Sequence, residues 1–195
     1  MTILEDRIEM ADKNIEHLDQ WFARLERMPV PEGIKVEIVG GDVFMTPQRS
    51  VHWHIIRRIT RALEDRFGMD VEALSDVRID FPGHENGFCP DVVKLREGAE
   101  EDSTGHWLHQ DVEFVAEVIS RGTAPNDYGP KKTAYAVADV PVYLIVDPYQ
   151  GKCHLYTQPK DGEYHTELSV TFGADIDMTN TIVDLTLKTD EFPRD

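Results

Sequence analysis

A glutamate stands within an almost entirely apolar run, VEFVAEVIS, over residues 112–120. Such a run predicts a strand that is covered on both faces of its sheet. Ionised carboxylates are rarely buried there without a cationic partner or a metal ion. Because alternate residues of a strand share a face, Glu117 points to the same side as Glu113 and Ile119. Glu117 is therefore either half of a structural ion pair, for example with Lys131, or a functional group.

A second carboxylate, Asp91, lies in FCPDVVKL over residues 88–95. A Pro-Asp pair at this point is compatible with a simple turn that feeds a strand. Two acids on neighbouring strands, with a lysine arriving from a following helix, also form a catalytic pattern. Mg²⁺ prefers carboxylate oxygens, and a nearby ammonium group can orient the attacking water and offset phosphate charge. Asp91, Glu117 and Lys131 thus supply the groups that phosphodiester cleavage needs.

Hydrophobic periodicity indicates the elements that would position these residues. Apolar side chains at helical spacing predict a helix over residues 50–67, and two β-rich runs around Gly40–Gly41 predict a hairpin. Strands are expected over 88–95, 112–120 and 141–148, a helix starts in KKTAYAVA, and antiparallel strands follow. This order predicts an α/β fold with one central mixed sheet flanked by helices.

The predicted domain organisation is an N-terminal helical extension over residues 1–30 and one domain over residues 31–195. Apolar positions at helical spacing over residues 3–28 predict the extension's helix. MPVPEG at 28–33 ends it, because two prolines and a glycine cannot continue a helix. The length suits a single domain with an appendage.

Composition restricts the setting and the partners. No apolar run is long enough to span a membrane, the start of the chain lacks a secretory signal, and Cys89 and Cys153 match no ligand or redox spacing. A cytoplasmic location is therefore expected. The net charge of −17 disfavours general DNA binding, which depends on Lys and Arg. It fits either a solubilising acidic surface or acids concentrated around a divalent cation.

A series of motifs resembles one large family. The series runs VEIVGGDVFMTP, SVHWHIIRRI, FCPDVVKL, VEFVAEVIS, D-x-x-x-K-x-x-x-Y in DYGPKKTAY, and VADVPVYLIVDP. In order and spacing it resembles the restriction-endonuclease-like proteins of bacteria, which are placed in the PD-(D/E)XK nuclease superfamily. The matched stretch covers about residues 33–158. The resemblance implies a restriction-endonuclease-like fold.

The resemblance also implies roles for individual residues. Asp91 takes the place of the PD aspartate and Glu117 the (D/E) position, so both would hold Mg²⁺ or Mn²⁺. Ile119 stands where the superfamily lysine usually lies, and Lys131, four residues before Tyr135, resembles the lysine of members that carry it on the next helix. Glu37 and His52 match an upstream acid and histidine, with a supporting or substrate-binding role.

Not every position follows the pattern. Gly40, Asp139 and Leu144 stand where the family often has Asp, Gly and Trp. The first weakens any role for acids in the hairpin, and the other two suggest changes in packing. His52 also has a plain interpretation, since a lone histidine is more often a capping or core group than a ligand.

The function predicted from the sequence is metal-dependent endonuclease-like hydrolysis of nucleic-acid phosphodiesters, of the endodeoxyribonuclease type, with DNA as the expected partner and a homodimer as the expected assembly. Two alternatives stay open. One is a non-catalytic binding or regulatory module that retains the nuclease fold, which the −17 charge favours. The other is a metal-dependent hydrolase of a small phosphate ester. Fold alone does not decide among them.

Overall fold

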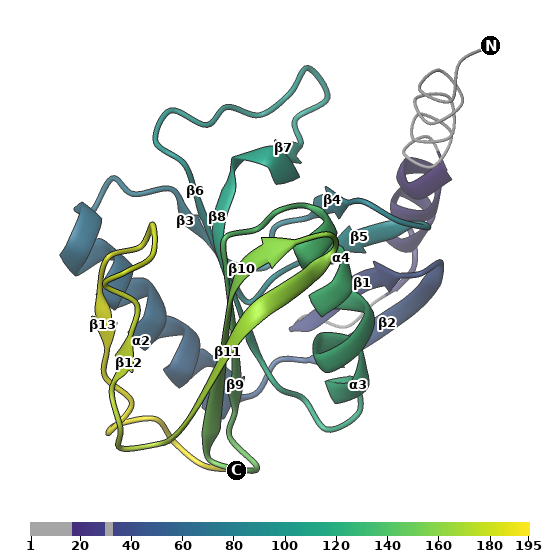
Figure 1. Ribbon diagram of the computed structural model, residues 1–195. Coiled ribbons are helices and arrows are strands. Elements are labelled where there is room, and N and C mark those ends of the chain that lie inside the picture. Colours follow the sequence, from purple (N-terminus) through teal and green to yellow (C-terminus); the bar gives the residue numbers. More distant parts are fainter. Residues whose placement is uncertain (1–16, 30–32) are drawn as a thin grey trace.

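The computed structural model describes residues 17–29 and 33–195, and its centre is a six-stranded mixed sheet in the order β11-β10-β9-β8-β6-β3 (Figure 1). Its strands are β3 (Ala73–Leu74), β6 (Val92–Leu95), β8 (Val112–Val118), β9 (Val142–Asp147), β10 (Lys152–Lys160) and β11 (Glu163–Thr171). β8 and β9 pair in parallel, whereas the other neighbours are antiparallel. The strands predicted over residues 112–120 and 141–148 are thus β8 and β9, side by side at the centre.

A second sheet has the order β2-β1-β5-β4-β7. Its strands are β1 (Ile34–Val39), β2 (Asp42–Pro47), β4 (Ile79–Phe81), β5 (Asn86–Phe88) and β7 (Trp107–Leu108). The predicted hairpin is β1–β2, and its two-residue turn at Gly40 and Gly41 has φ angles of 62° and 87°, which glycine adopts without strain. The expectation of one sheet is wrong here, because β4, β5 and β7 are too short to show a period, and they join the hairpin only through the long-range pairing of β5 with β1.

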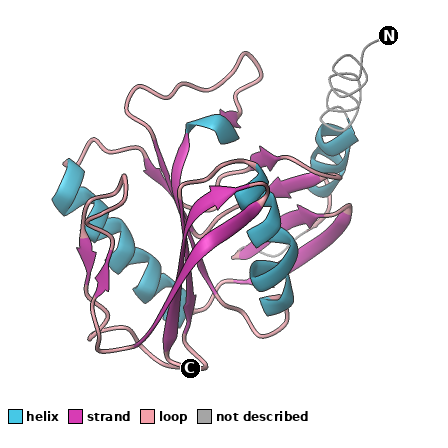
Figure 2. Ribbon diagram, viewed as in Figure 1, coloured by secondary structure: helices cyan, strands magenta, loops and turns pink. Residues whose placement is uncertain are grey.

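Helices cover both faces of the six-stranded sheet (Figure 2). On one face lies α2 (Ser50–Phe67), as predicted, with Arg49 as its N-cap residue. On the other lie α3 (Ala124–Asn126), a π-helical turn (Asp127–Lys131) and α4 (Lys132–Val137), which together connect β8 to β9. Strand β8, this helical connection and β9 form a βαβ unit, the usual way to join parallel strands. A 3₁₀ turn (His109–Asp111) precedes β8.

Part of the predicted N-terminal helix falls within the described residues. A helix over residues 17–25 packs Leu18 and Leu25 against Ile38 of β1, whereas residues 1–16 lie outside the described part of the chain. The division into an extension and a domain at residue 30 stays a prediction. None of the described helices is long and apolar enough to cross a membrane.

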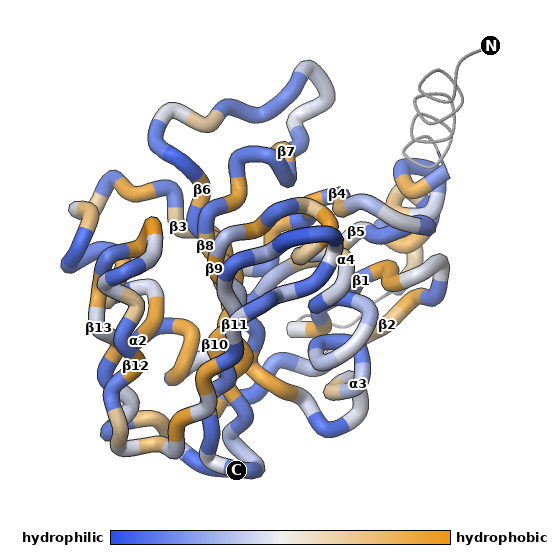
Figure 3. Tube along the Cα trace, in the orientation of Figure 1, coloured by the Kyte–Doolittle hydropathy of each residue, from blue (hydrophilic) through white to orange (hydrophobic). Residues whose placement is uncertain are grey.

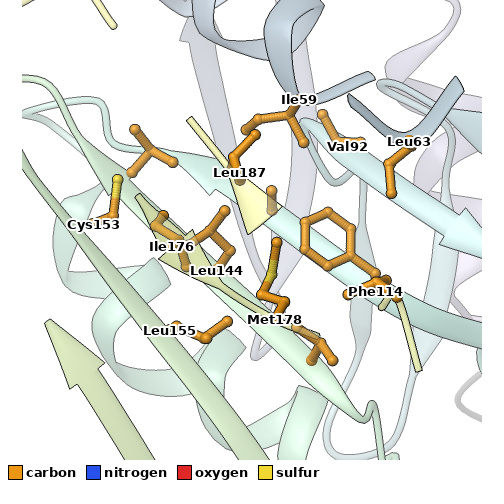
Figure 4. Close-up of a cluster of buried hydrophobic side chains, with 14 of the residues drawn as sticks. Ile59, Leu63, Val92, Phe114, Leu144, Cys153, Leu155, Ile176, Met178 and Leu187 are labelled. Atoms are coloured by element: carbon orange, nitrogen blue, oxygen red, sulfur yellow. The ribbon is translucent and has the colours of Figure 1, made fainter. Parts of the chain in front are cut away.

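The main core lies between α2 and the central sheet. Hydrophobic residues gather along the central strands (Figure 3), and a close-up shows Ile59 and Leu63 of α2 against Val92, Phe114 and Leu144 (Figure 4). The short strands β12 (Ile176–Asp177) and β13 (Thr186–Leu187) close this core from the outside. The restriction-endonuclease-like arrangement of a mixed sheet between helices is confirmed, and it leaves the ends of β6 and β8 beside β1.

Candidate active site

Asp91 and Glu117 meet where β6 begins beside β8. The register pairs Val92 with Ala116, which places Asp91 directly opposite Glu117. The amide N–H of Asp91 donates to Oε2 of Glu117 at 3.4 Å, and the amide N–H of Val118 donates to Oδ2 of Asp91 at 2.7 Å. Both carboxylates are buried, at 3% and 1% exposure. The backbone therefore fixes two acids from adjacent strands in one place.

Lys131 reaches the same place from the opposite side. Its Nζ lies 2.6 Å from Oε1 of Glu117, 2.9 Å from Oε1 of Glu37 and 3.2 Å from Oδ1 of Asp127. The π-helical turn that carries it contains Pro130, whose ring cannot donate the usual helical hydrogen bond. Lys132, by contrast, lies with its Nζ over the ring of Tyr156. Of the two neighbouring lysines, only Lys131 contacts the acids.

Further hydrogen bonds hold these carboxylates in position. The hydroxyl of Tyr135, one turn after Lys131, donates to Oε1 of Glu117 at 2.7 Å. The amide N–H of Cys89 donates to Oε1 of Glu37 at 2.9 Å. Glu117 and Glu37 are thus each oriented by at least one neutral donor in addition to Lys131. Such support fixes the geometry of a functional group.

Lys35 is a residue of the site that the sequence did not reveal. Its Nζ lies 2.7 Å from Oδ1 of Asp91, 3.7 Å from Oε2 of Glu117 and 3.8 Å from Oε2 of Glu37. The side chain is only 8% exposed. The ammonium group of Lys35 therefore lies among the carboxylates of these three residues.

A small pocket opens beside this cluster. It is lined by Lys35, Asp91 and Glu117, and also by Gln48 and His52. The Nε2 of His52 lies 3.1 Å from the carbonyl oxygen of Ile119 and 3.2 Å from Oγ of Ser120. Its buried Nδ1 has no hydrogen-bond partner among the described residues. His52 lies beside the acids without contacting them.

Asp76 marks the outer edge of the site. Its carboxylate accepts from Nε2 of Gln48 at 3.1 and 3.0 Å, its backbone has a positive φ of 57°, and its amide N–H donates to the carbonyl of Pro90. Burial raises the pKa of Asp76 to about 6, although Lys35 counteracts this rise. Asp76 thus adds a carboxylate that is mostly ionised above about pH 6.

The buried groups influence one another's ionisation strongly. Burial raises the pKa of Glu117 to about 8, against the attraction of Lys131 and Lys35. For Glu37 the same two lysines outweigh burial, and its pKa is lowered. The pKa of Lys35 is raised despite burial, chiefly by Asp91. The pKa of Lys131 is raised despite burial as well, chiefly by Glu117, so both lysines are cationic.

A second group of possible ligands lies elsewhere, at Asp19, Asp80 and His106. Arg78 already bridges the first two, with Nη2 2.8 Å from Asp19 and 2.7 Å from Asp80. Its guanidinium thus forms an ion pair with each of the two carboxylates. This group is accounted for as an ion-pair network.

The arrangement of a PD aspartate, a strand glutamate and a helix lysine on a mixed sheet invites comparison with known families. A family model described as "Putative restriction endonuclease" (Uma2) matches residues 22–190. The chain belongs to this family. Membership in the Uma2 family and the fold together point to a nuclease-like function.

A solved structure agrees with the Uma2 assignment. The chain superposes on the crystal structure of a "putative nuclease belonging to DUF820" from Anabaena variabilis with a TM-score of 0.68 and 12% sequence identity. The match covers 90% of this chain and 96% of the other. At this identity the likeness concerns the fold. Among curated proteins, none matches the chain.

Sequence reasoning located part of this cluster. The motifs predict Asp91, Glu117, Lys131 and Glu37 as site residues, and the structure brings the four side chains together. Lys35 was missed, although it is two residues before Glu37 and so shares its face of β1. Asp127 was missed as well. It lies four residues before Lys131, a spacing that brings side chains together on one helical face.

Proposed function

We propose that this protein is a divalent-metal-dependent nuclease that hydrolyses phosphodiester bonds of nucleic acid, in the first place DNA. One observation carries the proposal. Two buried carboxylates from paired strands, Asp91 and Glu117, lie beside a lysine whose ammonium group is 2.6 Å from one of them. A carboxylate pair and an ammonium group suit metal-assisted attack of water on a phosphate.

The charge of the cluster fits a divalent cation. Four carboxylates, those of Glu37, Asp91, Glu117 and Asp127, face the two ammonium groups of Lys35 and Lys131. When all six are ionised the excess of two negative charges equals the charge of one Mg²⁺ or Mn²⁺. The donors are carboxylate oxygens, which such ions prefer. In this proposal Asp91 and Glu117 hold the ion.

When bound, the ion would polarise the scissile phosphate and lower the pKa of an attacking water. The residues of the chain have their own tasks. The ammonium group of Lys131 holds Glu117 and Glu37 in place and offsets their negative charge beside the pocket. The hydroxyl of Tyr135 fixes Oε1 of Glu117, so that Oε2 faces the pocket. Glu37 acts as a support that keeps Lys131 cationic.

His52 and Gln48 line the pocket between the acids and solvent. The unpartnered, buried Nδ1 of His52 and the amide of Gln48 are polar groups that a phosphate or a water could meet. We assign both a role in positioning the substrate, consistent with the supporting role expected for His52.

A second candidate function is a non-catalytic binding or regulatory module that keeps the nuclease fold. The position of Lys35 favours it, because the ammonium group already compensates the carboxylates that would hold the ion. A cluster satisfied by lysine needs no metal for stability. The two functions differ in whether a divalent ion can displace Lys35.

A cleavage assay tests the proposal. Purified protein is incubated with labelled single- and double-stranded DNA, with Mg²⁺, with Mn²⁺ and with chelator. We expect products only with a divalent ion, and none from Asp91→Asn, which keeps the shape of the side chain and removes its charge. Lys160→Gln, at an exposed position of β10, is the control and should cleave as the wild type does. Cleavage that persists in chelator or in Asp91→Asn would contradict the proposal.

A further inference from the structure

A stripe of cationic and aromatic side chains runs along the outer face of α2. Trp53, Arg57 and Arg61 follow one another at intervals of four residues, and Arg49 precedes them at the helix start. Residues four apart lie on one face of a helix, and the four side chains span about 18 Å at 1.5 Å per residue. Trp53 is 59% exposed and Arg61 71%. We call these four residues the α2 stripe.

The α2 stripe borders a groove that leads to the candidate active site. A groove of about 920 Å³ between α2 and residues 185–191 is lined by Trp53, Arg57 and Arg61. Trp53 also lines an adjoining pocket of about 340 Å³, together with Gln48 and Arg49. Gln48 in turn lines the pocket that contains Asp91 and Glu117. Shared lining residues thus connect the acids with the far end of the α2 stripe.

The charge of the α2 stripe contrasts with that of the whole chain. The α2 stripe carries three guanidinium groups, although the net charge of the protein is −17. Arg57 forms no ion pair with any described residue, and Arg49 and Arg61 pair only with the partly or fully exposed Asp195 and Asp65. Exposed pairs contribute little, so both arginines can exchange these partners for another anion.

The other arginines of the helix are engaged differently. Arg58 pairs with Glu191, and Arg66 pairs with Asp184 at 2.6 Å. Both also donate to backbone carbonyls of these two residues. They attach the C-terminal segment to α2 and so form the far wall of the groove. That wall carries Lys188, Asp190 and Glu191, whereas α2 lines the groove with four arginines against two acids, Glu64 and Asp65, so the α2 side is the cationic one.

We propose that the α2 stripe binds a single-stranded segment of nucleic acid and guides it to the candidate active site. The delivery of the strand to an active site rests on the proposed function, whereas the binding of the strand does not. A cationic row beside an exposed aromatic ring is the combination that proteins use for single strands, where arginines follow the backbone and the ring stacks on an unpaired base. A duplex keeps its base faces stacked inside, so Trp53 would have no comparable partner there.

Binding measurements test the inference independently of cleavage. Fluorescein-labelled oligothymidylate and oligouridylate of about 15 nucleotides, and a DNA duplex of the same length, are titrated with protein. The buffer contains Ca²⁺ at fixed ionic strength, and the oligonucleotides are checked for integrity afterwards. We expect at least one of the two single strands, the DNA or the RNA, to bind more tightly than the duplex.

Substitutions in the α2 stripe test whether the single strand binds there. Trp53→Ala should weaken single-strand binding by about 5- to 150-fold, the effect of losing one stacked base. Arg57→Gln/Arg61→Gln should weaken it by about tenfold or more and reduce the slope of log Kd against log salt by about 1.4, or 0.7 for each lost phosphate contact. Arg24→Gln/Lys160→Gln removes the same charge from exposed positions outside the groove and should leave binding unchanged.

Several outcomes would overturn the inference. These are the absence of single-strand binding by the wild type, tighter binding of duplex that is insensitive to Trp53→Ala, or equal losses in the control variant. The proposed function can fail separately. If the protein binds through the α2 stripe but never cleaves, the nuclease proposal is wrong and the inference stands.

Discussion

The Nζ of Lys35 lies 2.7 Å from Oδ1 of Asp91, and the two side chains are 8% and 5% exposed. This buried contact places a cation beside one of the two acids that we assign to the metal ion. A divalent cation at the same carboxylate would repel the ammonium group strongly at such short range. In our account Lys35 therefore leaves Asp91 when the ion binds.

The first prediction concerns this competition. Lys35→Met keeps most of the volume of the side chain and removes its charge, so the ion no longer has to displace a cation. We expect Mn²⁺ affinity to rise by at least about tenfold, because a unit charge about 4 Å away is worth roughly 1–4 kcal/mol between aqueous and near-surface dielectric constants. Isothermal titration calorimetry measures it.

The same variant should lose stability without metal. Three carboxylates would face one another with less compensation, and removing one partner of a buried ion pair costs about 3–5 kcal/mol. Thermal unfolding with and without Mn²⁺ separates the two effects. A Lys35→Met protein that binds Mn²⁺ no better than the wild type would show that Lys35 does not compete with the ion.

The second prediction separates two neighbouring lysines. Lys131 contacts Glu37, Glu117 and Asp127, whereas Lys132 lies over Tyr156. Lys131→Met should abolish cleavage and lower the melting temperature, because it leaves buried carboxylates uncompensated. Lys132→Met is the matched control and should keep most of the activity. Loss of cleavage in Lys132→Met alone would contradict the assignment.

The third prediction follows from the pKa of Glu117, which burial raises to about 8 from 4.5. Between these values the native protein holds a proton on Glu117 that the unfolded chain releases. The contribution of this group to stability is thus complete below about pH 4.5 and is lost as the pH rises through about 8, by at most about 1.4 kcal/mol per pH unit. Chemical unfolding of the metal-free protein over this range measures the slope.

Glu117→Gln is the comparison for that slope. Glutamine does not titrate, so the fall in the free energy of unfolding between pH 4.5 and 8 should be smaller in this variant by the contribution of one proton. Identical slopes in the two proteins would mean that Glu117 is already ionised in the folded state across this range.

The fourth prediction concerns metal-dependent binding of duplex DNA. Without a divalent ion the acidic cluster repels phosphate, and a chain with a charge of −17 should bind duplex weakly. At fixed ionic strength, Mg²⁺ or Mn²⁺ should tighten binding, and Asp91→Asn should remove this gain. Tight binding that needs no metal and persists in Asp91→Asn would favour the non-catalytic module.

Local patterns predicted most of the elements correctly. The apolar periodicity of residues 50–67 gives α2, and the two apolar runs give β8 and β9 at the centre of the sheet. The second sheet could not be predicted, because the two- and three-residue strands β4, β5 and β7 carry no period, and only the pairing of β5 with β1 joins them to the hairpin. Long-range pairing has no local signal in a single chain.

The residues of the candidate site could likewise be predicted only in part from the sequence. A carboxylate in an apolar strand drew attention to Glu117, and the resemblance to a family added Asp91, Lys131 and Glu37. Lys35 gave no signal, since a lysine near the start of an edge hairpin is ordinarily exposed. Only the tertiary packing of β1 against the start of β6 buries its ammonium group beside Asp91.

The most direct test is a crystal structure of the protein grown with Mn²⁺, with anomalous differences measured near the manganese absorption edge. Our account predicts an anomalous peak between Asp91 and Glu117, with oxygen–metal distances close to the about 2.0–2.1 Å of Mg²⁺ sites, and Nζ of Lys35 turned away from Asp91. A manganese-saturated crystal without a peak there, and with Lys35 still bound to Asp91, would contradict it.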